Sequence, residues 1–376
     1  MPYFDYNATA PLHPTALATW REAAEHGWHN PSSPYRAAAR AHALLEQARE
    51  HIAALIGGPA EDYVFTSGAT EANNAVFSYF SRTAPATARV AVSAVEHPCV
   101  LEAALRWFPG RVIVLPCDAQ GVVPPESVQD ALKGGNVALV SLMAANNETG
   151  ALQPWRESLA LCRSAGVPFH CDAAQWLGKL PADGLADCDF LTGSAHKFGG
   201  PKGAGFLKIA ASQHSFHGQV GGEQERGRRA GTENLPGICA MAAALQTVIP
   251  RLAAEGAGWE GARKLFEGGL HRVLPGAEIV SPHVPRLWNT VMFLAPRHLN
   301  LRWVAALDQR GCQVSTGSAC ATGRAGPSHV LAAMGVPADS AKRALRVSAG
   351  WDTTTADWEA LLAALGEARA ALDLDN

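Results

Sequence analysis

A lysine between two strand-like runs is the residue whose position best suits covalent chemistry. Residues 189–207 read DFLTGSAHKFGGPKGAGFL, so Lys197 follows one strand-like run and precedes a Gly- and Pro-rich loop. In open α/β sheets, ligand sites lie beyond the carboxyl ends of the strands. A lysine placed there can form a Schiff base if its surroundings lower its pKa. The alternative is a solvated loop lysine, and Lys202 could take the same role.

Polar residues at the ends of other strand-like runs could surround an aromatic cofactor beside this lysine. Asp172 follows the run 167–171 and could pair with a pyridinium nitrogen. Gln175 and Asn147 also follow strand ends and offer neutral hydrogen bonds to ring substituents. His97 comes after a further run and could stack on a ring and move protons, although a lone histidine is more often structural.

Two further positions suit anions. The turn SGATE at 67–71 opens a predicted helix, where backbone N–H groups and the helix dipole favour a phosphate; an ordinary helix cap is the alternative. Arg346 interrupts an apolar strand-like run, and a buried arginine needs an anionic partner. A substrate carboxylate held by two hydrogen bonds would serve, and an internal Asp or Glu is the other interpretation.

Cys320 lies in the small-residue segment QVSTGSACATGRAGPS at 313–328, which has little bulk to bury a thiol. Nucleophilic sulfur chemistry requires an accessible thiolate of low pKa, although the cysteine could also be incidental to the loop. We expect Cys99 and Cys171 to be packing residues. The eight cysteines lack framework spacing and any Cys-x-x-Cys pair, which favours reduced thiols and argues against a structural zinc site.

The elements around these residues alternate between strand and helix. Strands are expected at 90–95, 112–115, 137–142, 167–171 and 189–191, and helices at 71–80, 100–107 and 155–165. This order predicts a mostly parallel sheet with helices on both faces. After about residue 250 the pattern becomes a smaller α+β domain, with helices at 262–273 and 301–309, strands at 290–294 and 346–348, and a last helix with an apolar face from Trp358 to Leu372.

Composition limits the class of protein. The net charge of -3 offers no electrostatic surface for nucleic acid or an anionic membrane, and the one tight basic cluster is Arg226, Arg228 and Arg229. The first residues lack a basic region followed by an apolar run, so we expect a cytoplasmic protein. The apolar stretch 236–250 is expected to be too short and interrupted to span a bilayer.

The order and spacing of these segments resemble the class V aminotransferase family of fold-type I pyridoxal-phosphate (PLP) enzymes. Within it they resemble the cysteine desulfurases of the nitrogen-fixation and iron–sulfur-cluster type. The likeness runs nearly end to end, through DYNAT at 5–9, NPSS at 30–33, FTSGATEANN at 65–74, EH at 96–97, NNETG at 146–150, DAAQ at 172–175, SAHK at 194–197, ERGRRAGTEN at 225–234 and STGSAC at 315–320.

The resemblance implies an α/β fold with a large, mostly parallel sheet of the seven-stranded type and a smaller α+β domain. Residues 1–14 would form an arm packing with the small domain, 15–250 the large PLP-binding domain, and 251–376 the small domain. The catalytic cysteine loop would occupy about 312–328.

The resemblance also assigns roles to individual residues. The residues expected to hold the cofactor are Ala69, Thr70, His97, Asn147, Asp172, Gln175, Ser194, His196, Lys197 and Thr232. Among them Lys197 would carry the Schiff base, and Thr232 would reach the phosphate from a second subunit, which implies a homodimer. Asn147 and Arg346 would bind the substrate, L-cysteine.

The implied reaction converts L-cysteine to L-alanine, with Lys197, His97 and Cys320 as catalytic residues. Cys320 would carry a persulfide to an acceptor, either an iron–sulfur scaffold or a thiolation enzyme. Selenocysteine lyase, another β-lyase, a transaminase and a non-catalytic scaffold are the alternatives. A metal hydrolase has less support, because His170, Cys171 and Asp172 alternate across a strand. Gly199 and Glu223 depart from the family pattern.

Overall fold

A computed structural model describes residues 2–317 and 328–374 of the chain. Its main sheet has seven strands in the order β1-β7-β6-β5-β4-β2-β3. Strands β2 to β6 pair in parallel with one another, whereas β7 is antiparallel to both β1 and β6. The bounds are β1 Tyr63–Thr66, β2 Arg89–Ser93, β3 Val112–Leu115, β4 Val137–Ser141, β5 Phe169–Asp172, β6 Phe190–Ser194 and β7 Gly205–Ile209. The expected mostly parallel sheet is confirmed.

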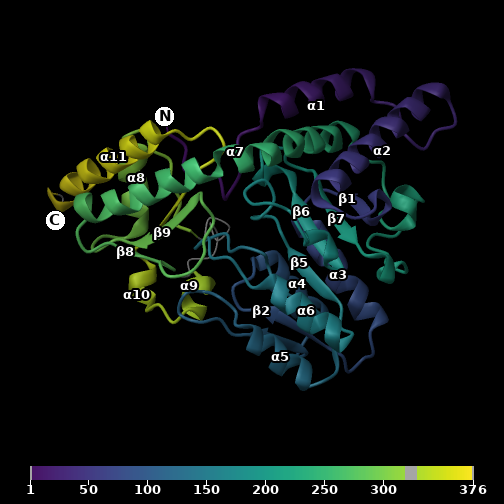
Figure 1. Cartoon of the computed structure of the whole chain (residues 1–376), viewed down its shortest axis with the longest axis horizontal. Helices are drawn as coiled ribbons and strands as arrows, with labels where there is room; N and C mark the ends of the chain where they lie inside the picture. Colours follow the sequence, from purple (N-terminus) through teal and green to yellow (C-terminus); the bar gives the residue numbers. More distant parts are fainter. Residues whose placement is uncertain (1, 318–327, 375–376) are drawn as a thin grey trace.

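Helices cover both faces of this sheet (Figure 1). The helices of the described part of the chain are α1 Pro14–His26, α2 Arg36–Ile56, α3 Ala69–Thr83, α4 Pro98–Trp107, α5 Pro125–Lys133, α6 Trp155–Ala165, α7 Leu235–Val273, α8 Asn300–Asp308, α9 His329–Ala333, α10 Ala338–Ala341 and α11 Thr355–Leu374. Successive side chains of a strand point to opposite faces. In β2, Val90 and Val92 therefore pack with α3 and α4, while Ala91 belongs to the apolar cluster on the other face.

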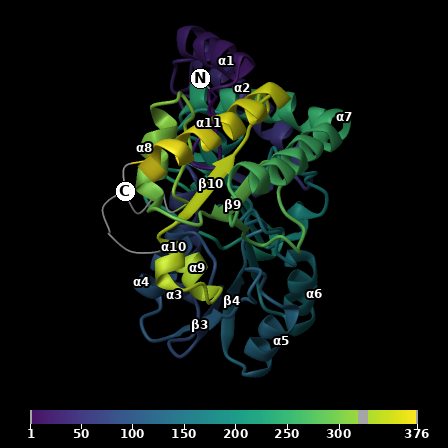
Figure 2. The ribbon, with the colours of Figure 1, turned by 90° about the vertical axis from the view of Figure 1, so that its left-hand side faces the viewer.

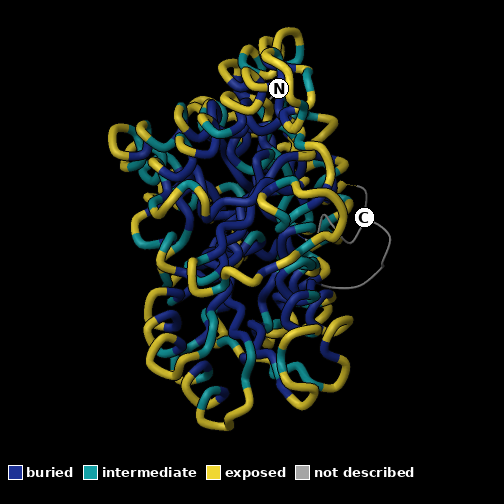
Figure 3. Tube along the Cα trace, turned by 90° about the vertical axis from the view of Figure 1, so that its right-hand side faces the viewer, coloured by how far each residue is buried: buried dark blue, intermediate teal, exposed yellow. Residues whose placement is uncertain are grey.

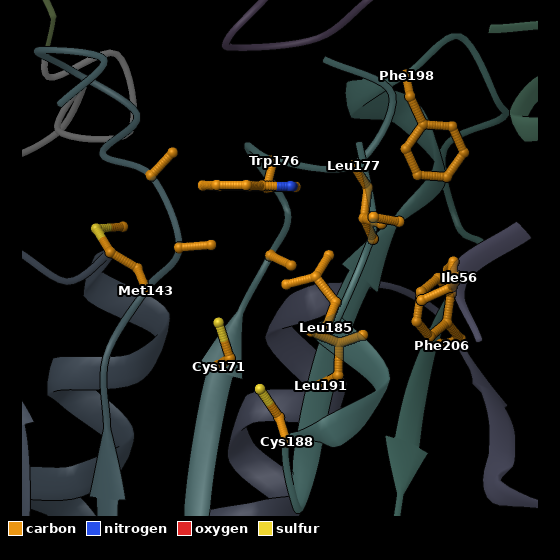
Figure 4. Packing of buried hydrophobic residues seen from close by; sticks show 14 of the residues in the cluster. Ile56, Met143, Cys171, Trp176, Leu177, Leu185, Cys188, Leu191, Phe198 and Phe206 are labelled. Carbon is orange, nitrogen blue, oxygen red and sulfur yellow. The ribbon is translucent and has the colours of Figure 1, made fainter. Parts of the chain in front are cut away.

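Buried residues fill the interior, and exposed residues lie mainly in the peripheral loops and on the outer helix surfaces (Figure 3). Under the functional end of the sheet, Cys171, Leu191 and Phe206 from neighbouring strands pack with Trp176 and Leu177 (Figure 4). Each of these side chains is at most 9% exposed. The strand ends above this layer therefore rest on a close-packed support.

A second, antiparallel sheet has the order β10-β9-β8, with bounds β8 Glu278–Ile279, β9 Thr290–Leu294 and β10 Ala344–Ser348. Helices α8 and α11 lie beside β9 and β10 (Figure 2) and share an apolar cluster with them. Phe4 from the start of the chain joins this cluster, and its N–H donates to the Gln313 carbonyl. The N-terminal segment is thus attached to the same cluster as the second sheet.

Helix α7 is a single helix of 39 residues that contains both the apolar stretch 236–250 and the helix expected at 262–273. The boundary expected at 250–251 falls inside it, and the three-part division of the chain stays a prediction. In the part of the chain that the structure describes, α7 is the one helix long and apolar enough to cross a membrane, but 56% of its apolar window is buried in the protein. Such burial is typical of a core helix.

Candidate active site

A cavity of about 390 Å³ opens at the carboxyl ends of the parallel strands. Nine of the sequence-predicted residues line it: Ala69, Thr70, His97, Asn147, Asp172, Gln175, Ser194, His196 and Lys197. They come from segments that follow β1, β2, β4, β5 and β6. Because parallel strands end at the same edge, residues more than a hundred positions apart in the sequence share one cavity.

The amine of Lys197 is directed by the N-terminal segment. Its Nζ donates to the backbone carbonyl oxygens of Asn7 at 2.6 Å and Ala8 at 3.0 Å. Lys202 also lines the cavity, but it is an exposed residue. The geometry therefore favours Lys197, the half-buried lysine, for covalent attachment.

Asp172 presents a buried carboxylate to the same cavity and is 5% exposed. Its Oδ2 accepts from Asn73 Nδ2 at 2.8 Å, and its Oδ1 accepts from the Ala174 N–H at 2.9 Å. Both donors are neutral. A negative charge held in this way can still bind a cationic group in the cavity, as the pyridinium prediction requires.

His97 is held with a defined ring orientation. The Cys99 N–H donates to His97 Nδ1 at 3.2 Å, and Cys99 Sγ lies 3.0 Å from the same nitrogen. Burial lowers the pKa of His97, and the nearby Lys197 lowers it further against the opposing effect of Asp172. Burial also raises the pKa of the Cys99 thiol to about 12, so the thiol is protonated and can donate. A neutral His97 that accepts at Nδ1 carries its proton on Nε2.

Cys99 packs against the apolar cluster around α3 and α4, as expected. It also lines the cavity, where its Sγ lies 3.0 Å from His97 Nδ1. Cys171 is fully buried in the core, as expected.

The other end of the cavity is formed by the start of α3. The first intrahelical hydrogen bond of α3 is donated by the Ala72 N–H to the Gly68 carbonyl. The backbone N–H groups of residues 69–71 therefore have no acceptor within the helix. A Cβ at Gly205 would lie 2.6 Å from the Gly68 Cα, so glycine is required for the close approach of β7 to this turn. Ser194 and His196 line the adjoining wall, and burial lowers the pKa of His196 to about 4. The arrangement suits a phosphate.

Asn147 and Gln175 are connected through Asn7. The Asn147 carbonyl accepts from Asn7 Nδ2 at 3.1 Å, and Gln175 Nε2 donates to the Asn7 carbonyl at 2.9 Å. Residue 7 thus links two of the predicted cofactor residues to Lys197, whose amine donates to the same carbonyl.

Arg346 has an internal acidic partner. It is 2% exposed, and its Nη2 donates to Asp5 Oδ1 at 2.6 Å. Its Nη1 donates to the carbonyls of Asn147 at 3.0 Å and Gly317 at 3.1 Å. Of the two sequence interpretations of Arg346, pairing with an internal Asp or Glu is therefore the one that describes the contacts in this structure. Binding of a substrate carboxylate by Arg346 stays a proposal, and a substrate would share the guanidinium with Asp5.

Two of the predicted residues that the structure describes, Thr232 and Arg346, do not line the cavity. Thr232 is exposed. Cys320 lies outside the described residues. Two of the three arginines near Thr232 pair with acids of the same chain: Arg229 with Glu71 at 2.8 Å and Arg226 with Glu46 at 3.2 Å.

Glu225 attaches the segment that bears Thr232 to the sheet. Its carboxylate accepts two hydrogen bonds from Arg49, at 2.7 and 3.1 Å, and one from the Phe65 N–H at 3.0 Å. The Glu225 side chain is 1% exposed and that of Arg49 is 3% exposed. Such a pair needs both partners, because one charge left alone in the interior is costly.

We predict that Glu225→Ala lowers the free energy of unfolding by about 3 kcal/mol, because Arg49 would lose its buried counter-ion and keep only the partly exposed Glu46, 3.1 Å away. Chemical denaturation of the purified protein measures this. Glu255→Ala is the matched control, since its pair with Arg251 is about one-third exposed on α7, and a loss below about 1 kcal/mol is expected there. Equal losses in the two variants would refute the structural importance of the Arg49 pair.

Four polar residues of the site were missed from the sequence alone: Asn7, Asn73, Lys179 and the buried Glu96, whose Oε1 accepts from the Met143 N–H at 2.5 Å. Burial raises the pKa of Glu96 well above its ordinary value, and the nearby Asp172 adds to this rise. Of these four, only Asn73 has a position in the helical pattern that indicates a buried polar group, because it falls on the buried side of α3 beside apolar residues.

The two departures from the family pattern lie away from the reacting groups. Gly199 has a φ of +89°, and a Cβ there would lie 3.3 Å from both His13 Cβ and Trp351 Nε1. The neighbouring His13 and Trp351 rings therefore take the space that a bulkier residue would need. Glu223 is exposed.

The cavity fits PLP. The start of α3 suits its phosphate, Asp172 with its neutral donors suits a protonated ring nitrogen, and Lys197 lies on the same cavity for the aldehyde. Among the residues that the structure describes, no group of three or more His, Cys, Asp or Glu side chains is placed to hold a metal ion.

Comparisons with known proteins agree with this chemistry. The family described as Aminotransferase class-V matches residues 2–361. Cysteine desulfurase IscS of Dictyoglomus turgidum is 34% identical over 94% of this chain and 91% of its own length. The solved structure of a NifS-like protein superposes with a TM-score of 0.90 at 30% identity, covering 98% of this chain and 99% of its own. The structure of SspA in complex with cysteine has a TM-score of 0.80 at 28% identity, covering 93% and 98% of the two chains.

The chain belongs to the class V aminotransferase family, whose fold and cofactor site it shares. Within that family it belongs with the cysteine desulfurases, which are PLP-dependent enzymes. The resemblance inferred from the sequence motifs is confirmed.

Proposed function

We propose that this enzyme converts L-cysteine to L-alanine and transfers the sulfur to Cys320 as a persulfide. The observation that carries the proposal is the convergence of Lys197, Asp172 and His97 on one cavity whose other end suits a phosphate. The fold similarity to a protein solved with cysteine supports the choice of substrate.

Lys197, Asp172, Gln175, Asn147 and the start of α3 would hold PLP, with Ser194 and His196 at the phosphate. When bound, PLP withdraws electrons from the substrate α-carbon and so makes its proton acidic. The Lys197 amine, held by the arm carbonyls, takes that proton at Nζ. Asp172 retains a proton on the ring nitrogen, and neutral His97 offers its Nε2–H as a donor within the cavity.

Sulfur transfer is then a displacement by the Cys320 thiolate. Its sulfur bonds to the substrate sulfur while the carbon–sulfur bond breaks, and the electron pair of that bond stays with carbon. Protonation of the carbon fragment gives alanine, and the enzyme keeps an S–S bond. A thiol acceptor attacks the outer sulfur and regenerates the Cys320 thiol, which suits delivery to an iron–sulfur scaffold or a thiolation enzyme.

We propose a cytoplasmic homodimer in which Thr232 contacts the phosphate of the other subunit. Thr232 is exposed, so it can contact a second chain. Large apolar side chains that a second subunit would cover are also exposed, among them Trp28 at 70% and Val220 at 81%.

The function is tested by measuring products from L-cysteine, L-selenocysteine and cysteine sulfinate side by side, in dithiothreitol and PLP. We expect equal amounts of alanine and sulfide from cysteine, and a slower release of alanine from the sulfinate. Faster alanine release from selenocysteine with little from cysteine would indicate a selenocysteine lyase. A colourless protein that binds no PLP would contradict the enzymatic function.

A further inference from the structure

A second lysine lies buried beneath the candidate site, and the reaction outlined above does not use it. Lys179 is 5% exposed and follows β5 by seven residues. Its Nζ donates to Asn7 Oδ1 at 2.8 Å and to Gln175 Oε1. Burial lowers its pKa well below the ordinary value, and the cations Lys197 and Arg346 lower it further. Its hydrogen-bonded acceptors are neutral amide oxygens, which an amine in either protonation state can satisfy.

The contacts of Gln175 define which way its amide faces. Oε1 accepts from Lys179, and Nε2 donates to the Asn7 carbonyl at 2.9 Å. A reversed amide would place Oε1 against the Asn7 carbonyl oxygen, so two acceptors would meet. It would also separate Oε1 from the Lys179 donor. The network therefore permits one orientation of this side chain.

This orientation matters because Gln175 lines the cavity beside Lys197 and Asp172. An amide nitrogen has two hydrogens, and the Asn7 carbonyl takes one of them. The second is available to a ligand in the cavity. PLP carries a ring hydroxyl beside the carbon that joins the lysine, and an N–H donor stabilises the ionised form of such an oxygen, whereas a carbonyl would destabilise it.

We propose that Lys179 is a positioning residue, which fixes the Gln175 amide so that an N–H and not the C=O faces the cofactor ring oxygen. The inference rests on the proposed function, because it takes Gln175 to contact the cofactor. It adds a residue that touches neither the cofactor nor the substrate and acts through a neighbour.

The test compares Lys179→Met, Gln175→Ala and the double variant with the wild type. Two readouts are used: the affinity of the apoprotein for PLP, from quenching of tryptophan fluorescence, and the pH midpoint of the visible absorbance of the bound cofactor. Lys179→Met is expected to weaken PLP binding about five- to tenfold and to raise the midpoint by about 0.5–1 unit, since the ionised ring oxygen loses a fixed donor. In the Gln175→Ala background the same change is expected to have no further effect.

A matched control is available in Lys208, which is 3% exposed on β7 and donates to the carbonyls of Ala186 and Cys188. Lys208→Met also removes a buried amine, but it is expected to lower stability and leave the midpoint unchanged. If Lys179→Met does not fold, Lys179→Gln replaces it, since the shorter amide cannot reach Asn7 and Gln175 together.

The outcomes separate this inference from the proposed function. A midpoint shift by Lys179→Met that persists in the Gln175→Ala background would overturn the inference, because the lysine would then act directly through its charge. An unchanged midpoint in Lys179→Met would overturn it as well. An unchanged midpoint and affinity in Gln175→Ala would instead overturn the cofactor contact on which the proposed function depends.

Discussion

Lys197→Ala is expected to lower the rate of alanine formation from cysteine by about 10⁴-fold or more, because the substitution removes both the covalent attachment of PLP and the base for the α proton. The amine reaches the cavity because the Asn7 and Ala8 carbonyls hold it there. Alanine is measured over time at saturating cysteine and PLP.

Lys202→Ala is the control for this prediction. Lys202 lines the same cavity but is exposed, so its charge is screened by water and salt and a loss of about threefold or less is expected. A near-normal rate in Lys197→Ala together with a large loss in Lys202→Ala would show that the roles of the two lysines are reversed.

The residues grouped from the strand pattern alone are those at strand ends. Asp172 ends β5, and His97 and Lys197 follow β2 and β6. Short apolar runs locate strands well, and parallel strands bring their ends to one edge, so the order of the runs was enough to group these side chains.

The missed residues depend on contacts that no local pattern encodes. Asn73 reaches Asp172 across 99 residues, and Asn7 reaches Lys179 across 172. The N-terminal segment contacts both the site and the second sheet, and the family resemblance indicated the arm but not these individual contacts. Arg346 shows the same limit, because its partner Asp5 lies 341 residues away.

Helix α7 crosses the domain boundary that the change of pattern after about residue 250 indicated. Proline as a rule ends or kinks a helix, but Pro250 lies inside this one. The helix continues because tertiary packing outweighs the lost hydrogen bond: Leu245, Val248 and Leu252 are buried around Pro250. Local propensity was a poor guide where burial of a long apolar face decided the structure.

The chemistry of the described cysteines narrows the choice of sulfur acceptor. Seven free thiols lie in the described part of the chain. Cys99 and Cys117 are partly buried, and five are fully buried: Cys162, Cys171, Cys188, Cys239 and Cys312. Burial raises the pKa of Cys99 and Cys162 to about 12 and that of Cys239 to about 11, and it raises the pKa of Cys117, Cys171 and Cys312 as well. A protonated thiol is a poor nucleophile, so these residues are unsuited to attack the substrate sulfur.

The segment containing Cys320 is joined to the site at both ends. The Gly317 carbonyl accepts from Arg346 Nη1 at 3.1 Å, and Ser328 Oγ donates to Glu148 at 2.5 Å. Glu148 follows Asn147, which lines the cavity.

Cys320→Ala is therefore expected to reduce sulfide release from cysteine, measured with dithiothreitol, to below about one hundredth of the wild-type rate, because no other thiolate is available to take the sulfur. The visible absorbance of bound PLP should stay at the wild-type level, since Lys197 and Asp172 are unchanged. Cys117→Ala removes a half-buried thiol that does not line the cavity and is expected to retain the full rate. Wild-type turnover in Cys320→Ala would reject this residue as the acceptor. Cys99→Ser would then be the next variant to assay, because Cys99 is the described thiol that lines the cavity.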